Sequence, residues 1–292
     1  MSDARIIDSG YRRYDGARLG AQHATVALWK HTLRRILGLG RPARWKALPV
    51  LAIAIAYVPN IVFVGVTAIV PDDRIRNSLL PGYAFTYGFI TAAIALFVVF
   101  VAPEALCPDR RSGILSLYLA TPLTRSRYIA AKAAAVFTSL LLVTLGPPLL
   151  YLIGLSAQNA GPHGLAGFLG TLGRIALSGV ILAAFFTGLS VGASSLTDRK
   201  AFAAAGIFFF SQVVGAFVTI IVDVAKGPSW ILGFSTNAAV FSLVLHIFGQ
   251  GRIVTAGGDV VPMAAFAAGT AFWTVLGGAI AWWRYARLRV TR

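Results

Sequence analysis

Charged residues are scarce in this chain of 292 residues. Asp, Glu, Lys and Arg make up 12% of it, about half of the roughly 25% that is typical of soluble domains. Hydrophobic residues reach 57%, and the mean hydropathy is +0.75. So few charges cannot cover a surface that faces water. The composition excludes an ordinary soluble enzyme and indicates an all-α protein that crosses a membrane many times.

Acidic residues are scarcer still than basic ones. Ten Asp and Glu residues stand against 26 Lys and Arg residues, which gives a net charge of +16. In a soluble protein this balance would suggest nucleic-acid binding, but here the basic residues lie between apolar runs and form no separate basic domain. We expect no nucleic-acid partner and interpret these residues as topology signals and contacts to membrane lipids. The single cysteine, Cys107, excludes an intrachain disulfide.

The sequence also lacks the motifs of common catalytic and cofactor sites. It has no G-x-x-x-x-G-K-[ST] phosphate loop, no H-E-x-x-H and no Cys/His cluster, and its four histidines are scattered. Serines in the apolar runs have no Asp/His pair at hand. We therefore expect no catalytic residue, no metal site and no bound cofactor in this chain, and we do not expect it to be an enzyme.

Six apolar runs are long enough to cross a bilayer, which takes about 20 residues. None of them contains Asp, Glu, Lys, Arg or His. Ion-driven transporters place such groups at membrane depth, so a transporter built from this chain would take its energy from a partner. The predicted spans are residues 47–70, 82–102, 133–155, 175–196, 201–222 and 263–283.

Basic residues predict the orientation of these spans, because Lys and Arg concentrate on the cytoplasmic side. With six spans and an internal N-terminus, 21 of the 26 fall inside. We expect both termini in the cytoplasm, with an N-terminal region of residues 1–46, a transmembrane domain of residues 47–283 and a basic tail of residues 284–292. The five basic residues then left outside are Arg74, Arg76, Arg174, Lys226 and Arg252.

A seventh apolar stretch, Trp230–Gly249, precedes the last span and contains several polar residues. If it crossed the membrane, the four arginines near the C-terminus would lie outside. We therefore interpret it as an interfacial or re-entrant helix on the outer face.

The segment at residues 24–39 has the pattern of an amphipathic helix lying on the inner leaflet. Apolar and basic residues alternate at helical spacing, and Arg41-Pro42 then turns the chain into the first span. A plain membrane anchor and a coupling role are both consistent with this pattern. The interface residues that we single out are Trp29, Lys30, Leu33, Arg34 and Arg35.

A charged, turn-rich segment at residues 104–132 separates the second and third spans. Asp109 is suited to cap a helix that begins near Arg110, and Thr124 to cap the next helix. Glu104 lies where Arg34 or Arg35 of the amphipathic helix is a suitable partner. A solvated loop is the alternative to a docking loop. The apolar residues that we expect to form one stripe for a partner's groove are Ile114, Leu115, Leu117 and Leu119.

The same loop follows a longer pattern. Its members are Glu104, Asp109-Arg110-Arg111, Gly113-Ile114-Leu115, Tyr118-Leu119, Thr121-Pro122-Leu123-Thr124-Arg125, Tyr128 and Lys132. This pattern resembles the signature loop of the type-2 family of ABC exporter permeases. The topology is similar as well, so the resemblance covers nearly the whole chain. Ala131 stands where the family often has glycine before the lysine.

The resemblance implies the permease subunit of an ATP-driven exporter, and the apolar spans favour a hydrophobic or amphipathic cargo. A second permease copy or a related permease would complete the membrane part, and ATP and Mg would be bound by a separate ATP-binding subunit. The resemblance also implies a location in the bacterial inner membrane. The coupling residues implied by the pattern and by the turn at residues 196–200 are Glu104, Asp109, Arg110, Arg111, Gly113, Ile114, Leu115, Leu117, Tyr118, Asp198, Arg199 and Lys200.

Two alternatives remain from the sequence. One is a structural or regulatory membrane subunit that binds an ATPase and moves nothing. The other is an intramembrane lipid enzyme, for which polar catalytic residues at membrane depth are lacking. Within the spans, Gly188-x-x-x-Gly192 predicts a close helix contact. Residues that either line a cargo path or simply pack are Tyr83, Tyr87, Phe209 and Gln212.

Overall fold

The structure, a computed structural model, describes residues 19–70, 80–251 and 253–288. In these ranges the protein is all-α, and the only β-type pairing is a single bridge between Val254 and Val260. Residues 1–18, 71–79, 252 and 289–292 therefore contribute to the orientation argument by sequence alone. The basic residues that lie outside the described residues are Arg5, Arg12, Arg13, Arg18, Arg74, Arg76, Arg252, Arg289 and Arg292.

Six helical units long and apolar enough to span a membrane confirm the six predicted spans. Several exceed their predicted ranges, because hydropathy marks only the part that lies in hydrocarbon while the helix continues into polar sequence. In chain order they are α2 (Ala43–Ile69); α4 (Tyr83–Leu96) extended through η1 (Phe97–Val101), η2 (Ala102–Ala105) and α5 (Cys107–Arg111); α7 (Arg125–Thr144) with α8 (Gly146–Ala157); α9 (Gly164–Leu196); α10 (Lys200–Thr219) with η3 (Ile220–Val224); and α12 (Met263–Arg287).

Prolines act differently in two of these units. In the third unit, Pro147 and Pro148 follow directly on the break at Leu145 that separates α7 from α8, as expected where proline removes backbone donors. In α2 the helix continues through Pro49 and Pro59. The break thus occurs where two prolines are adjacent.

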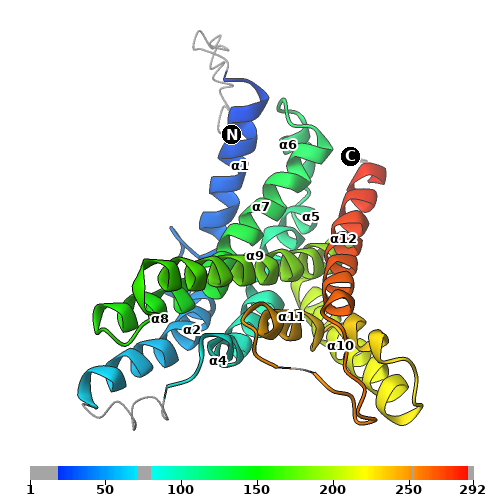
Figure 1. The fold of residues 1–292 in the computed structure, drawn as a ribbon. Helices are drawn as coiled ribbons and strands as arrows, with labels where there is room; N and C mark the ends of the chain where they lie inside the picture. Colours follow the sequence, from blue (N-terminus) through cyan, green and yellow to red (C-terminus); the bar gives the residue numbers. More distant parts are fainter. Residues whose placement is uncertain (1–18, 71–79, 252, 289–292) are drawn as a thin grey trace, which may run out of the picture.

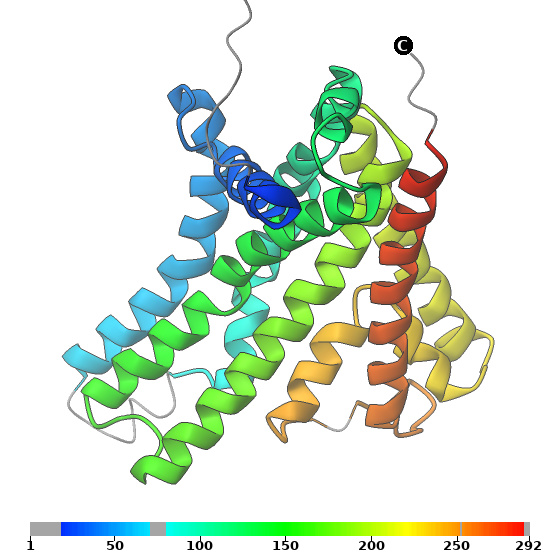
Figure 2. The same cartoon turned by 90° about the horizontal axis from the view of Figure 1, so that it is seen from above.

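The molecule has two clearly different ends (Figure 1). At one of them lie α1 (Gly20–Ile36), α6 (Leu115–Leu119) and the C-terminal end of α12. We call this the basic end, because α1, the residues around α6 and the last turn of α12 carry most of the described Lys and Arg residues. Figure 2 shows α1 nearly end-on while α2, α9 and α12 run along the page, so α1 lies crosswise to the spanning helices.

The stretch before the last span forms a re-entrant hairpin. Its first arm is η4 (Ser229–Phe234) and its second is α11 (Ala239–Ile247). Trp273 Nε1, well inside α12, donates a hydrogen bond of 2.8 Å to Phe234 O. Thr236 Oγ1 donates one of 2.8 Å to Ser211 O, in the middle of α10. The chain therefore reaches the level of mid-span and turns back, and α11 with nine residues is too short to cross a bilayer.

Close packing of α9 against α12 organises the half of the molecule next to this hairpin. A Cβ added to Gly188 would lie 2.6 Å from Thr274 O, and one added to Gly192 would lie 2.9 Å from Gly277 Cα. Only glycine permits backbones to approach this closely. The predicted contact at Gly188-x-x-x-Gly192 is therefore present, with α12 as its partner.

Candidate functional site

The loop between the second and third spanning units carries two short helices at the basic end. α5 ends at Arg111, and α6 runs from Leu115 to Leu119 with no buried residue. Gly113, between them, has φ +68°, a left-handed conformation that glycine adopts without steric cost. Figure 1 shows α6 projecting beside α1. The expected single helix capped by Asp109 is wrong, because α5 already begins at Cys107 and has no side-chain cap.

The apolar residues of this loop point in two directions. Leu117 is 67% exposed and Ile114 38% exposed, so these two face outward. Leu115 and Leu119 instead line a small hollow together with Tyr285. Residues two apart on a helix do not share a face, which is why the single stripe expected from the sequence is wrong. The outward surface for a partner is Ile114 and Leu117.

Behind the loop, Asp109 is completely buried and fully paired. Its Oδ1 accepts a hydrogen bond of 2.6 Å from Arg35 Nη1 of α1. Its Oδ2 lies 2.6 Å from Lys132 Nζ and accepts a bond of 2.9 Å from the Tyr128 hydroxyl, both of α7. The side chains of Asp109 and Lys132 are 0% exposed. Asp109 therefore joins α5 to α1 and α7 and does not itself reach a partner's surface.

Tyr118 connects the exposed helix to this buried pair. Its ring lies 5.7 Å from Lys132 Nζ and 5.8 Å from the ring of Tyr128. A cation over an aromatic face is attracted by the ring quadrupole. Tyr118 thus places α6 in contact with Lys132, which pairs with Asp109.

Glu104 is the centre of a second group of ion pairs. Its Oε1 lies 2.8 Å from Arg41 Nη1 and 3.4 Å from Arg35 Nε, while its Oε2 contacts Lys200 Nζ. The sequence-based pairing of Glu104 with an arginine of the amphipathic helix is confirmed for Arg35. Arg35 also binds Asp109, so it bridges both groups. We call the six residues of these groups the charge cluster: Arg35, Arg41, Glu104, Asp109, Lys132 and Lys200.

Four cations and two carboxylates make the charge cluster electropositive. One outcome is visible at His31 on α1, whose pKa is lowered by desolvation and by the neighbouring cations Lys132 and Arg35. Buried ions are costly unless they are paired and hydrogen-bonded. Every carboxylate oxygen of the cluster meets a donor, and buried Lys132 is held by its ion pair with Asp109 without a hydrogen bond that satisfies geometric criteria. These pairs join four helices to one another.

Arg110 links the loop to the turn after α9. Its Nη1 donates to Ser195 O and, over 3.3 Å, to Thr197 O. The turn itself exposes Asp198 and Arg199 at the same end of the molecule. The two segments that the sequence singled out for partner contact are therefore joined by a side chain. Arg111 and Gly113 are exposed beside them.

The amphipathic helix at residues 24–39 is α1, although only part of the predicted division of its faces is correct. Lys30 and Arg34 are exposed, as a face toward headgroups requires. Trp29 Nε1 donates a bond of 3.3 Å to Thr138 Oγ1 of α7, and Leu33 packs against the core. Arg35, expected on the polar face, turns inward because Asp109 and Glu104 lie beneath it.

Comparison with known proteins now decides the family. Residues 21–230 match the family described as ABC-2 family transporter protein. The chain belongs to the ABC-2 transporter family. No match to a curated protein is found.

Membership of the ABC-2 family makes this chain a multi-pass membrane component, the permease part of an ABC transporter, and implies an ATP-binding partner subunit in general terms. The matched range contains α1, the charge cluster and both segments exposed at the basic end. The family assignment therefore covers the whole candidate site.

The four candidate path residues of this ABC-2 chain do not lie together. Tyr87 is 1% exposed and its hydroxyl donates to Ile175 O over 3.1 Å, so it packs in the core. The ring of Tyr83 lies 5.5 Å from that of Tyr151. Phe209 is exposed on α10, and Gln212 accepts a bond of 2.7 Å from Asn237 Nδ2 of the re-entrant hairpin.

Sequence reasoning missed part of the charge cluster. Lys132 was expected just outside the third span, and Arg41 only as part of a turn. Their burial depends on which helices pack together, and no local pattern contains that information. The sequence did contain one signal. Tyr128 and Lys132 are four residues apart and so share a helix face, and in the structure both side chains contact Asp109.

Proposed function

We propose that this chain is the membrane subunit of an ATP-driven exporter for hydrophobic or amphipathic cargo. A separate ATP-binding subunit would bind ATP and Mg²⁺, and this chain would bind neither. The observation that carries the proposal is the path from the exposed α6 through Tyr118 to Lys132 and Asp109. It offers a route by which movement of a docked ATPase reaches α1, α7 and α10.

The proposal places the basic end in the cytoplasm of a bacterial cell, with both termini there and the chain in the inner membrane. The distribution of Lys and Arg supports this orientation. So does α1, whose exposed Lys30 and Arg34 would meet the phosphates of the inner leaflet. The re-entrant hairpin would then open toward the outside.

Docking of the ATPase would use Ile114 and Leu117, with Arg111 beside them. The turn with Asp198 and Arg199 would form the second contact. Exposed apolar anchors surrounded by charges suit a helix-in-groove contact. The charge cluster would transmit movement and not touch the partner, so the coupling residues divide into an outer and an inner set.

A second permease copy, or a related permease, would pack against the groove between α4 with η1 and α10. This groove of about 690 Å³ is lined by Val99, Phe100, Ala201, Ala204 and Phe208, among others. The alanines of α10 suit close helix packing in a membrane. Phe209 and Gln212 would then border a cargo path on α10.

The test is co-purification with an ATP-binding-cassette subunit, reconstitution into vesicles, and measurement of ATP hydrolysis and cargo movement. The cargo set would be a fluorescent phospholipid, an amphipathic peptide and a hydrophobic dye. Glu104→Gln should leave binding of the ATPase intact and reduce stimulated hydrolysis several-fold, because it releases Arg41 and Lys200 from their shared partner. Asp259→Asn, an exposed acid outside the charge cluster and outside both proposed docking segments, is the matched control.

Two outcomes would count against the exporter. Transport that follows a proton gradient and persists without ATP would contradict it, since the spans hold no group for a coupling ion. Stimulated hydrolysis with no movement of any of the three cargoes would favour the regulatory subunit instead.

A further inference from the structure

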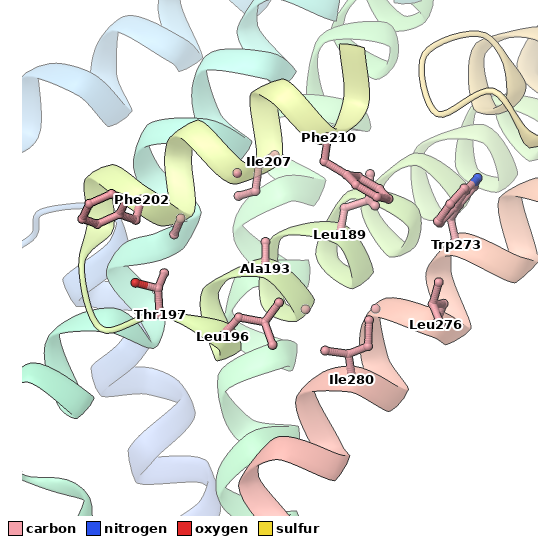
Figure 3. Close-up of a pocket in the computed structure, with 14 residues that line it drawn as sticks. Leu189, Ala193, Leu196, Thr197, Phe202, Ile207, Phe210, Trp273, Leu276 and Ile280 are labelled. Atoms are coloured by element: carbon pink, nitrogen blue, oxygen red, sulfur yellow. The ribbon is translucent and has the colours of Figure 1, made fainter. Parts of the chain in front are cut away.

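An apolar pocket of about 320 Å³ lies between α9, α10 and α12, away from both the charge cluster and the groove proposed for a second copy. Figure 3 shows the side chains of Leu189, Ala193, Ile207, Leu276 and Ile280 directed into it from the three helices. The side chain of Thr197, at one end, is its only hydroxyl. A pocket with this lining favours a hydrocarbon ligand.

Glycines explain why the space exists. Gly192 and Gly277 bring the backbones of α9 and α12 together, so the two helices form one wall. On α10, Gly206 lines the opposite wall, and a Cβ added there would meet nothing within 4 Å. A residue with a side chain at position 206 would project into the open space.

The pocket has the length of one leaflet's hydrocarbon. It runs along α10 from Phe202 to Phe210, eight residues or about 12 Å at the helical rise. Half of a bilayer's hydrocarbon core is roughly 15 Å. The end of the pocket nearest mid-span is closed by Phe210 and Trp273, whose rings lie 5.3 Å apart. This is the level at which the re-entrant hairpin turns. The other end lies beside Thr197, at the basic end.

The cation Arg199 lies at the end of the pocket beside Thr197. The guanidinium carbon of Arg199 lies 5.7 Å from the ring centroid of Phe202, which is 62% exposed and lines the pocket. Within the described ranges Arg199 forms no ion pair. Leu196, at the same end, is 57% exposed, so the rest of the described chain leaves the mouth uncovered.

We propose that this pocket holds one acyl chain of an anionic membrane phospholipid, whose phosphate pairs with Arg199. The lipid is a resident ligand at the basic end. The proposal does not depend on the exporter function, because it concerns only how the chain sits in its membrane.

The size of the pocket supports a single chain over a protein helix. The pocket volume of about 320 Å³ is small beside an α-helix with its side chains, which is at least about 10 Å in diameter. The helix of a second copy is therefore too wide to enter. The charge at the mouth selects a phosphate with no compensating ammonium over a zwitterionic headgroup.

The experiment uses the full chain in vesicles that contain phosphatidylglycerol with a photoreactive diazirine in its acyl chain. After irradiation, labelled peptides should map to the pocket walls on α9, α10 and α12. Gly206→Leu fills the space and should lower this labelling at least fivefold. Gly278→Leu is the matched control: Gly278 is exposed on α12 and also has nothing within 4 Å, so labelling should stay within about twofold of the wild type.

Arg199→Gln tests the headgroup separately and affects only an exposed side chain. The wild type should label several-fold more strongly with the phosphatidylglycerol probe than with a phosphatidylethanolamine probe of the same chain, and Arg199→Gln should abolish that preference. Uniform labelling of all lipid-facing residues, or wild-type labelling in Gly206→Leu, would overturn the proposal. So would an interchain disulfide formed through Phe202→Cys, because another protein chain would then occupy the mouth.

Discussion

At the scale of single residues, the distinctive feature is that a protein with only ten acidic residues buries one of them with its counter-charges. Asp109 and Lys132 are both fully buried, and Arg35 completes the pairing. The removal of one partner from such a group leaves an unpaired buried charge, which costs far more than the pair contributes. These residues therefore depend on one another.

Asp109→Asn should lower the free energy of unfolding by about 3 kcal/mol, because Lys132 and Arg35 lose their shared counter-charge. Adding Lys132→Met should recover part of this loss, since the second change removes one of the stranded cations. The measurement is denaturant unfolding of the purified protein, arranged as a double-mutant cycle. Asp198→Asn, exposed at the same end, should stay within about 0.5 kcal/mol. Additive effects of Asp109→Asn and Lys132→Met would show that the pair is not coupled.

At the scale of elements, the sequence predicted which segments exist better than which way their side chains face. Long apolar runs identify spans because the bilayer imposes their length, and all six were found. The cap at Thr124 was also predicted, and its Oγ1 accepts a bond of 3.3 Å from Arg127 N. The direction in which a side chain points is decided by packing between segments that are distant in the sequence. Arg35 and Leu115 turn inward for partners at positions 109 and 285, which no local window contains.

The exposed face of α6 carries the next prediction. Ile114→Ala together with Leu117→Ala should reduce affinity for the ATP-binding subunit, since each buried anchor of an interface is worth on the order of 2 kcal/mol, or more than tenfold in the dissociation constant. Leu115→Ala should instead destabilise the loop, because Leu115 packs inward. Leu165→Ala, 74% exposed on α9 far from the loop, is the control. Binding would be measured by co-purification and titration.

If the double variant recovers the ATPase at the wild-type yield with normal stimulated hydrolysis, the outward face of α6 is not the docking surface. The turn with Asp198 and Arg199, or α1, would then have to supply the contact.

The contact between α9 and α12 gives a comparison between adjacent positions. Gly277→Val should lower the yield and thermal stability of folded protein, because a Cβ at Gly277 would overlap the backbone of Gly188. Gly278→Val should be tolerated, since nothing lies within 4 Å of a Cβ there. Melting of the two variants in the same detergent is the measurement. Equal melting temperatures would mean that α9 and α12 are not held by this contact.

At the scale of the whole molecule, the basic end holds the charge cluster and most of the described Lys and Arg residues. The charge cluster joins α1, α5, α7 and α10. Tyr118 of α6 contacts it through Lys132. The re-entrant hairpin lies toward the other end of the molecule (Figure 2). The charge cluster thus connects several spanning helices at one end of the molecule, and this connection is what the proposed coupling to a separate subunit would use.

This polarity predicts the sidedness of labelling in intact cells. With Cys107 replaced by Ala, His163→Cys and Gly249→Cys should react with a membrane-impermeant maleimide from outside. Both positions are exposed, and they adjoin the start of α9 and the end of α11, which lie at the end opposite to α6 (Figure 2). Ser116→Cys on α6 should react only after the membrane is permeabilised. Position 249 is decisive for the hairpin: it follows α11, so a stretch that crossed the bilayer would place it inside, on the side of Ser116. Labelling of Gly249→Cys only in permeabilised cells, with His163→Cys still labelled from outside, would contradict the re-entrant hairpin and leave the other spans in place.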